Sequence, residues 1–174
     1  MPVNKEPMVL SAYQALEESR VSEIVVVTGR DHAEVETLLS VAPPHKLVHN
    51  SDFNLGMTTS IQKGISEATG HAYMICMADM PWLGTHHYNV LLENFERVYS
   101  ENKSGILIPK VNTTRGNPVI FSSHYRQQIL NHREMTGCRQ IVRENGQHLV
   151  EYTTDDHAFI KDVDTPEDYQ ALIS

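Results

Sequence analysis

The chain has 174 residues, of which 40% are hydrophobic and 21% are charged, and its formal net charge is −8 at pH 7. This length and composition indicate a single soluble globular domain over residues 1–174, long enough to bury a core. The acidic charge argues against a nucleic-acid partner, because binding a phosphate backbone requires clustered lysine and arginine. No segment approaches the run of about 20 apolar residues that a membrane span requires, so no membrane partner is expected.

The two cysteines indicate a reducing compartment. Cys76 and Cys138 are too few for a disulfide framework, and Cys76 lies in an apolar run that predicts a core position. The opening MPVNKEPMVL has neither the length nor the flanks of a signal peptide. We therefore expect the protein to be cytoplasmic.

The first half of the chain alternates between helical and strand patterns. In chain order, the predicted elements are a helix over 7–18, a strand over 23–29, a helix over 31–42, a strand over 46–50, a helix over 58–70 and a strand over 72–78. Asp31 is expected to cap the second helix, and Pro43-Pro44 is expected to end it.

The second half continues with the same classes of element. The predicted order is a helix over 85–100, strands over 105–110 and 117–121, helices over 122–132 and 136–145, the strands QHLVEY and AFIKDVD, and a last helix after Thr165-Pro166. A proline near the start of the 117–121 strand predicts an edge or bulged strand. The alternation predicts an α/β fold with a parallel sheet that helices cover on both faces.

An acid follows the most apolar of the predicted strands. The stretch YMICMADMPWL, residues 73–83, is almost entirely apolar until Asp79, and Met80-Pro81 follow at once. One interpretation is a turn or helix-cap acid before a proline. The other is a magnesium ligand, because parallel sheets bind ligands beyond the carboxyl ends of their strands, and Mg²⁺ prefers one or two carboxylates with phosphate oxygens.

A second acidic cluster is DVDTPED, residues 162–168. Thr165 and the residues after it have a structural explanation as the start of the last helix. Asp162 and Asp164 have no such explanation, and both project to the same side if the segment is extended. Two neighbouring acids on one side are unfavourable unless a cation neutralises them. Together with Asp79 they predict a Mg²⁺ site.

The loop NLGMTTSIQKG, residues 54–64, is a candidate ligand loop. Gly56 permits a close approach of the backbone to a ligand, and the helix start after it favours phosphate or a base. The simpler interpretation is that Thr58, Thr59 or Ser60 only caps that helix.

A second candidate loop is TRGNPVIF, residues 114–121. A turn explains Gly116 and Pro118 without any ligand. Arg115 and Asn117, however, carry the types of donor that would contact a phosphate or an amide-bearing ring.

Four motifs in order, HNSDFNLGMTTSI, MADMPWL, RGNPVIF and DVDTPEDY, resemble those of the MobA-like nucleotidyltransferase family, and the shorter CRQIV (138–142) resembles a family helix. The resemblance runs from about residue 7 to the end of the chain. It is greatest to the molybdenum cofactor cytidylyltransferase branch, because DVDTPED has Asp where the guanylyltransferase branch usually has Asn. It implies a three-layer α/β/α sandwich with a mainly parallel sheet, similar to nucleotide-diphospho-sugar transferases.

The resemblance also implies a reaction and the roles of individual residues. Members transfer a nucleotide, here CMP from CTP or else GMP from GTP, to the phosphate of molybdopterin and release pyrophosphate. Asp79 would bind the Mg²⁺ that bridges the triphosphate, and Asp164 would be the second ligand, with Asp162 beside it. The remaining implied positions are Asn54, Gly56 and Ser60 facing the nucleotide or the acceptor, and Gly116 and Pro118 shaping the acceptor wall.

The chain departs from the family pattern at its start. Members begin with a strand and a glycine-rich LAAGxSxRxG loop that cradles the triphosphate, whereas MPVNKEPMVLSAYQAL resembles the segment just after that loop. We therefore expect an N-terminally truncated domain that lacks the first strand and that, as given, binds nucleotide weakly.

Two other functions stay open from the sequence. A non-catalytic binding or assembly module would keep the fold without the phosphate loop, although the three retained acids count against it. DVD is also a metal motif of nucleotide-sugar glycosyltransferases, although its position near the C-terminal end of this chain disfavours a glycosyltransferase function. The identity of the acceptor, self-association and a molybdoenzyme partner are not fixed by the sequence.

Overall fold

The computed structural model describes residues 2–3, 6–40, 46–165 and 168. Two predictions therefore lie outside the described residues: the stop at Pro43-Pro44 and most of the last helix. At the start of that helix, the Thr165 backbone N–H donates to the Asp168 carboxylate at 3.0 Å, and the Asp168 N–H donates to the Thr165 hydroxyl at 3.1 Å. This reciprocal pair is the hydrogen-bond pattern of a capping box.

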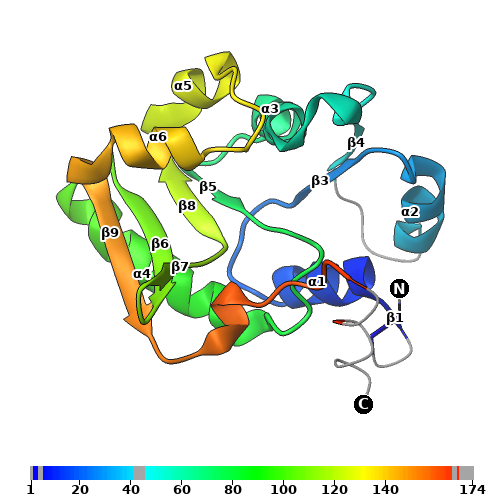
Figure 1. The fold of residues 1–174 in the computed structure, drawn as a ribbon, viewed down its shortest axis with the longest axis horizontal. Coiled ribbons are helices and arrows are strands. Elements are labelled where there is room, and N and C mark those ends of the chain that lie inside the picture. Colours follow the sequence, from blue (N-terminus) through cyan, green and yellow to red (C-terminus); the bar gives the residue numbers. More distant parts are fainter. Residues whose placement is uncertain (1, 4–5, 41–45, 166–167, 169–174) are drawn as a thin grey trace.

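Helices and strands follow one another along most of the chain (Figure 1). The α-helices are α1 (Met8–Glu17), α2 (His32–Leu39), α3 (Met57–Glu67), α4 (Thr85–Glu101), α5 (Arg126–Asn131) and α6 (Arg139–Glu144). The 3₁₀ turns are η1 (Phe53–Leu55), η2 (Ser123–Tyr125), η3 (Gly146–His148) and η4 (His157–Ile160). The strands are β1 (Pro2–Val3), β2 (Glu6–Pro7), β3 (Val25–Thr28), β4 (Lys46–His49), β5 (Ala72–Ile75), β6 (Ile106–Val111), β7 (Thr114–Arg115), β8 (Val119–Ser122) and β9 (Leu149–Thr154). No described helix combines the length and apolar character needed to cross a membrane.

The larger strands form two separate hydrogen-bonded groups. β3 and β4 are a parallel pair, whereas β5, β8, β6 and β7 form one sheet in that order, with β9 parallel to β6 on its other edge. β8 is antiparallel to both β5 and β6, so β5, β6 and β9 point the same way. Among the described residues, no strand pairing joins β3 to β5.

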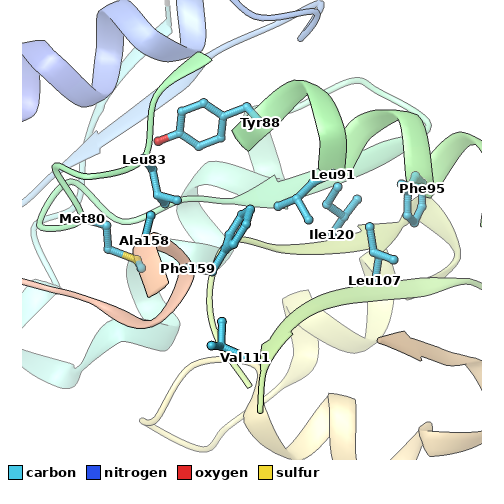
Figure 2. Close-up of a cluster of buried hydrophobic side chains, with 10 residues drawn as sticks. All are labelled: Met80, Leu83, Tyr88, Leu91, Phe95, Leu107, Val111, Ile120, Ala158 and Phe159. Atoms are coloured by element: carbon cyan, nitrogen blue, oxygen red, sulfur yellow. The ribbon is translucent and has the colours of Figure 1, made fainter. Parts of the chain in front are cut away.

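Alternate residues of the central strands build two cores, one on each face of the main sheet. Leu107 of β6 and Ile120 of β8 pack against Leu91 of α4, as Figure 2 shows. Their neighbours Ile106 and Phe121 belong instead to the cluster that contains residues of α3, α5 and α6. The sheet therefore lies between two helical layers, which confirms the predicted three-layer α/β/α sandwich.

The prediction of an edge strand at 117–121 is wrong. β8 lies between β5 and β6, and its residues are mostly buried. Pro118 stands before the first strand residue, Val119, so its missing N–H removes no hydrogen bond from the sheet. A short hairpin strand, β7, was not predicted.

The prediction that AFIKDVD forms a strand is also wrong. Its first residues belong to η4, and residues 161–164 have no regular secondary structure. The reason is local: the Asp156 side chain accepts a hydrogen bond from the Ala158 N–H at 2.9 Å and so caps a 3₁₀ turn. Asp31 does stand at the N-cap of α2, but its side chain makes no capping hydrogen bond.

Candidate active site

Asp79 lies in the loop that links β5 to α4. The strand ends at Ile75, earlier than the apolar run predicted, and Asp79 is only partly buried. The next residue, Met80, has 2% of its surface exposed and packs in the cluster that contains Ala158 of η4 (Figure 2). The buried methionine therefore anchors the loop directly beside the acid.

The two acids of the C-terminal motif lie beside this loop. The Val163 backbone N–H donates to the Asp79 carbonyl at 2.8 Å, although the two residues are far apart in the sequence. Val163 has 8% of its surface exposed, whereas Asp162 and Asp164 on either side of it are exposed. The structure thus brings the backbone of this segment against the Asp79 loop, with the two motif acids exposed and near enough for their charges to act on Asp79. The carboxylate oxygens of Asp79, Asp162 and Asp164 do not all lie within 4.8 Å of one another.

The electrostatics of Asp79 suit a cation. Burial raises the pKa of its carboxyl group, and the negative charges of Asp162 and Asp164 raise this pKa further. Its Oδ1 atom is buried and has no hydrogen-bond partner among the described residues. Because a buried carboxylate oxygen is costly without a partner, and because oxygen ligands suit Mg²⁺, the Asp79 carboxylate has the chemistry of a ligand for a divalent metal ion, and the exposed Asp162 and Asp164 are the nearby acids that could share it.

The loop before α3 is held by a buried asparagine that the sequence analysis missed. Asn50 has 3% of its surface exposed, and its side-chain amide donates to Thr59 Oγ1 and Ser60 Oγ, each at 2.9 Å. Its Oδ1 accepts from the Asp52 N–H at 3.0 Å. Ser60 is therefore engaged within the loop, whereas Asn54 is exposed.

The expected hydroxyl cap of α3 is wrong. Gly56 is the N-cap residue, and no side chain caps the helix there. Gly56 has a φ of 105° and faces Met135, whose carbonyl oxygen would lie 2.8 Å from an added Cβ. Thr58 instead donates its hydroxyl to the Glu134 carbonyl and accepts from the Gly137 N–H. These contacts attach the start of α3 to the segment after α5.

The 115–118 loop contacts the segment that leads to the motif acids. Gly116 is buried against the Phe159 carbonyl, and the Asn117 N–H donates to that carbonyl oxygen at 2.8 Å. The Asn117–Pro118 peptide bond is cis. Arg115 donates from Nε to Glu151 at 2.9 Å, so its guanidinium is already paired with a carboxylate. Among the described residues, no side-chain hydrogen bond or ion pair joins either loop to Asp79.

Comparisons with known proteins identify the family of this chain. The sequence profile of the MobA-like NTP transferase domain matches residues 1–151. The chain belongs to the MobA-like NTP transferase family. Membership makes the protein a nucleotidyltransferase. The matched region includes Asp79 but ends before Asp162 and Asp164, so the proximity of the 162–164 segment to Asp79 is known from the structure alone.

Relatives of this MobA-like protein were found in sequence and in structure. It is 24% identical over 148 residues to the molybdenum cofactor cytidylyltransferase of Escherichia coli (strain K12), covering 85% of the chain and 72% of that relative. The crystal structure of Rv0371c from Mycobacterium tuberculosis H37Rv has a TM-score of 0.82 at 14% identity, covering 99% of this chain and 86% of the other. A second structure of that protein, in complex with manganese, has a TM-score of 0.79 at 14% identity, covering 99% and 89%. These structures share the fold.

A second cluster in this MobA-like domain has the side chains of a metal site but a different geometry. His86, His87 and Asp156 offer ligand atoms within 4.8 Å of one another. However, the Gly84 N–H donates to Nδ1 of His87 at 2.8 Å, so the ring proton lies on Nε2, which donates to Asp156 Oδ2 at 2.9 Å. A metal on Nε2 would move that proton to Nδ1, where it would face another N–H. This cluster is therefore a hydrogen-bonded link rather than a metal centre.

The raised pKa of Asp79 predicts how the stability of the metal-free protein depends on pH. The folded state favours the neutral acid, so this stabilisation is complete below the unfolded value of about 3.9 and is lost as pH rises through the raised pKa. Asp79→Asn should remove this loss and raise the Tm at neutral pH. Thermal melts in EDTA from about pH 4 to about pH 8 measure the effect. The exposed Asp155→Asn is the control, and an identical pH dependence for Asp79→Asn and the unmodified protein would contradict the expectation.

Proposed function

We propose that this protein transfers CMP from CTP to the phosphate of a molybdopterin-type acceptor and releases pyrophosphate. The approach of Asp79 to Asp162 and Asp164, through the Val163 hydrogen bond, is the observation that supports the proposal most. The preference for CTP and for this acceptor is supported by the relative from E. coli and by Asp in DVDTPED.

In this proposal Asp79, Asp162 and Asp164 hold Mg²⁺. When bound, the ion neutralises charge on the triphosphate and on the departing pyrophosphate. The manganese complex of the Mycobacterium tuberculosis neighbour supports a divalent ion in this fold. Asp79 would present its Oδ1 atom, which has no hydrogen-bond partner within the described part of the chain, and the exposed Asp162 and Asp164 would supply further oxygens.

The reaction needs positioning more than proton transfer. An oxygen of the acceptor phosphate attacks the α-phosphorus of CTP, a new P–O bond forms, and the bond to the β-phosphate bridging oxygen breaks. A phosphate dianion is already a nucleophile, so no side chain has to act as a general base. Asn54 and the backbone at Gly56 are the proposed nucleotide contacts, because Asn54 is exposed and the start of α3 carries the positive end of the helix dipole.

The 115–118 loop is proposed to form one wall of the site that binds the acceptor. Gly116 and Pro118 are buried and give the loop its shape, and Asn117 has a partly exposed side chain. Arg115 forms an ion pair with Glu151, so in this proposal it stabilises the loop and does not offer an unpaired charge to the acceptor. The proposed location is the cytoplasm, in keeping with the two free cysteines.

Pyrophosphate release tests the proposal. The purified protein is incubated with Mg²⁺, molybdopterin and either CTP or GTP, and pyrophosphate is measured by a coupled phosphate assay. We expect slow release with CTP, because the sequence predicts weak nucleotide binding, with less release for GTP and none when the acceptor is omitted. Binding of CTP without any release would identify a non-catalytic module instead. Faster release with GTP would overturn the assignment of the base.

A further inference from the structure

A hydrogen bond between the buried His87 and the exposed Asp156 connects the two segments that carry the acids. Asp79 lies in the loop that precedes α4, and His87 is in the first turn of that helix. Asp156 immediately precedes η4, which leads to Asp162 and Asp164. The hydrogen bond from His87 Nε2 to Asp156 Oδ2 measures 2.9 Å. It is therefore a side-chain crosslink between the two halves of the candidate metal site.

We propose that His87 is a positioning residue: through Asp156 it holds the segment 156–164 so that Asp162 and Asp164 stay beside Asp79. This positioning role rests on the proposed function, in which the three acids share a metal ion. His87 itself touches neither substrate nor metal.

The helix gives His87 a fixed base. The residue has 5% of its surface exposed, and its neighbours on α4, Tyr88 and Leu91, are fully buried in the core. The Gly84 N–H fixes the ring from the other side through Nδ1. The edge-on contact with Phe159 of η4, with ring centroids 5.2 Å apart at 87°, further restricts the ring. His87 therefore approaches Asp156 from a rigid element.

The carboxylate of Asp156 transmits this restraint to the backbone. Oδ2 accepts from His87, while Oδ1 accepts from the Ala158 N–H at 2.9 Å and closes the first turn of η4. Both hydrogen bonds lower the pKa of Asp156, with Ala158 the larger cause, so the group stays an ionised double acceptor. The same segment is attached at Phe159 to the Asn117 N–H and at Val163 to the Asp79 carbonyl. The attachments at Phe159 and Val163 are backbone hydrogen bonds, whereas the His87–Asp156 bond joins two side chains and can be removed by substitution.

Two substitutions of His87 by amide residues remove its two hydrogen bonds one at a time. His87→Asn keeps an oxygen near the Nδ1 position for the Gly84 N–H but has no donor that reaches Asp156. His87→Gln places an N–H near the Nε2 position and keeps the donor to Asp156 but loses the acceptor for Gly84. Each variant loses one hydrogen bond, so their losses of folding stability should be similar, whereas only His87→Asn breaks the link.

Manganese binding to the nucleotide-free protein tests the inference. We expect His87→Asn to raise the Mn²⁺ Kd about tenfold or more, the range typical when residues that orient metal ligands are lost, and His87→Gln to stay within about twofold of the unmodified protein. Asp156→Asn should behave like His87→Asn, because an amide oxygen cannot replace both carboxylate acceptors. His71→Asn, at an exposed histidine, is the control and should change nothing.

The outcomes separate this inference from the proposed function. If the unmodified protein binds no Mn²⁺, the metal site and with it the proposed function fail. If the unmodified protein binds Mn²⁺ but His87→Asn and His87→Gln have the same Kd, the positioning role is overturned. Loss of Mn²⁺ binding that follows the Tm of each variant, regardless of which hydrogen bond is removed, would also overturn it.

Discussion

Replacing Asp79 with asparagine should lower the kcat of pyrophosphate release by about a thousandfold. The substitution keeps the size of the side chain but removes the charge, and losing a metal carboxylate removes several kcal/mol of transition-state stabilisation. The Oδ1 atom of Asp79 is buried without a partner among the described residues, so no neighbour replaces the lost oxygen. Steady-state kinetics at saturating CTP and Mg²⁺ measure the effect.

The control for this prediction is the exposed Asp155→Asn, which should leave kcat unchanged. The same Asp79 variant should be more stable than the unmodified protein in EDTA at neutral pH, so the loss of activity should not arise from unfolding. A variant that keeps activity within about tenfold would remove Asp79 from the catalytic site, because one decade corresponds to only about 1.4 kcal/mol.

Gly116→Ala should destabilise the protein by about 3 kcal/mol or more, which is the upper part of the range for overpacking. An added Cβ would lie 2.0 Å from the carbonyl oxygen of Phe159 and 2.8 Å from its carbonyl carbon. This obstacle is backbone, and the same oxygen accepts the hydrogen bond from Asn117, so it cannot move aside cheaply. For a domain of this size the Tm should fall by about 6–12 °C.

Gly146→Ala provides the matched control, because an added Cβ there meets nothing within 4 Å. Its Tm should be unchanged or slightly higher, since alanine reduces the entropy of the unfolded chain. Equal melting temperatures for the two variants would show that the 115–118 loop packs differently from the structure.

Sequence patterns predicted the layers of this fold because helical and strand patterns alternate along the chain and the central strands are apolar on both faces. Ile106 and Leu107, like Ile120 and Phe121, serve opposite faces, and each face needs its own helices. The position of β8 was not predictable in the same way. A strand that starts after a proline can be central when the proline stands outside the ladder, as Pro118 does.

Two features of the site depend on contacts that local sequence does not encode. The segment before Asp162 has a strand-like pattern, but the capping bond from Ala158 to Asp156 turns it into η4. The approach of Asp162 and Asp164 to Asp79 rests on a backbone hydrogen bond from Val163, which any residue except proline could make. The sequence could indicate which acids are candidate metal ligands, whereas their proximity in space could be seen only in the tertiary structure.

The supporting residues gave weak signals for the same reason. Asn50 follows a strand and precedes a helix, which is a typical position for a loop-stabilising asparagine, but its partners Thr59 and Ser60 emerge only on folding. His87 and Asp156 show no motif spacing, because one begins a helix and the other precedes a 3₁₀ turn far along the chain. Pairs of this kind become visible only as contacts.

The separation of β3 and β4 from the main sheet has a consequence for the motions of the protein. α2 has no buried residue and Thr28 is the buried residue of β3, whereas five of the six residues of β6 are buried. Amide protons in the β3–β4–α2 unit should therefore exchange with solvent through local opening, at a lower free-energy cost than global unfolding. Such opening breaks neither the Val163–Asp79 nor the His87–Asp156 hydrogen bond. The β3–β4–α2 unit can therefore fluctuate while the segments that carry Asp79, Asp162 and Asp164 keep their relative positions.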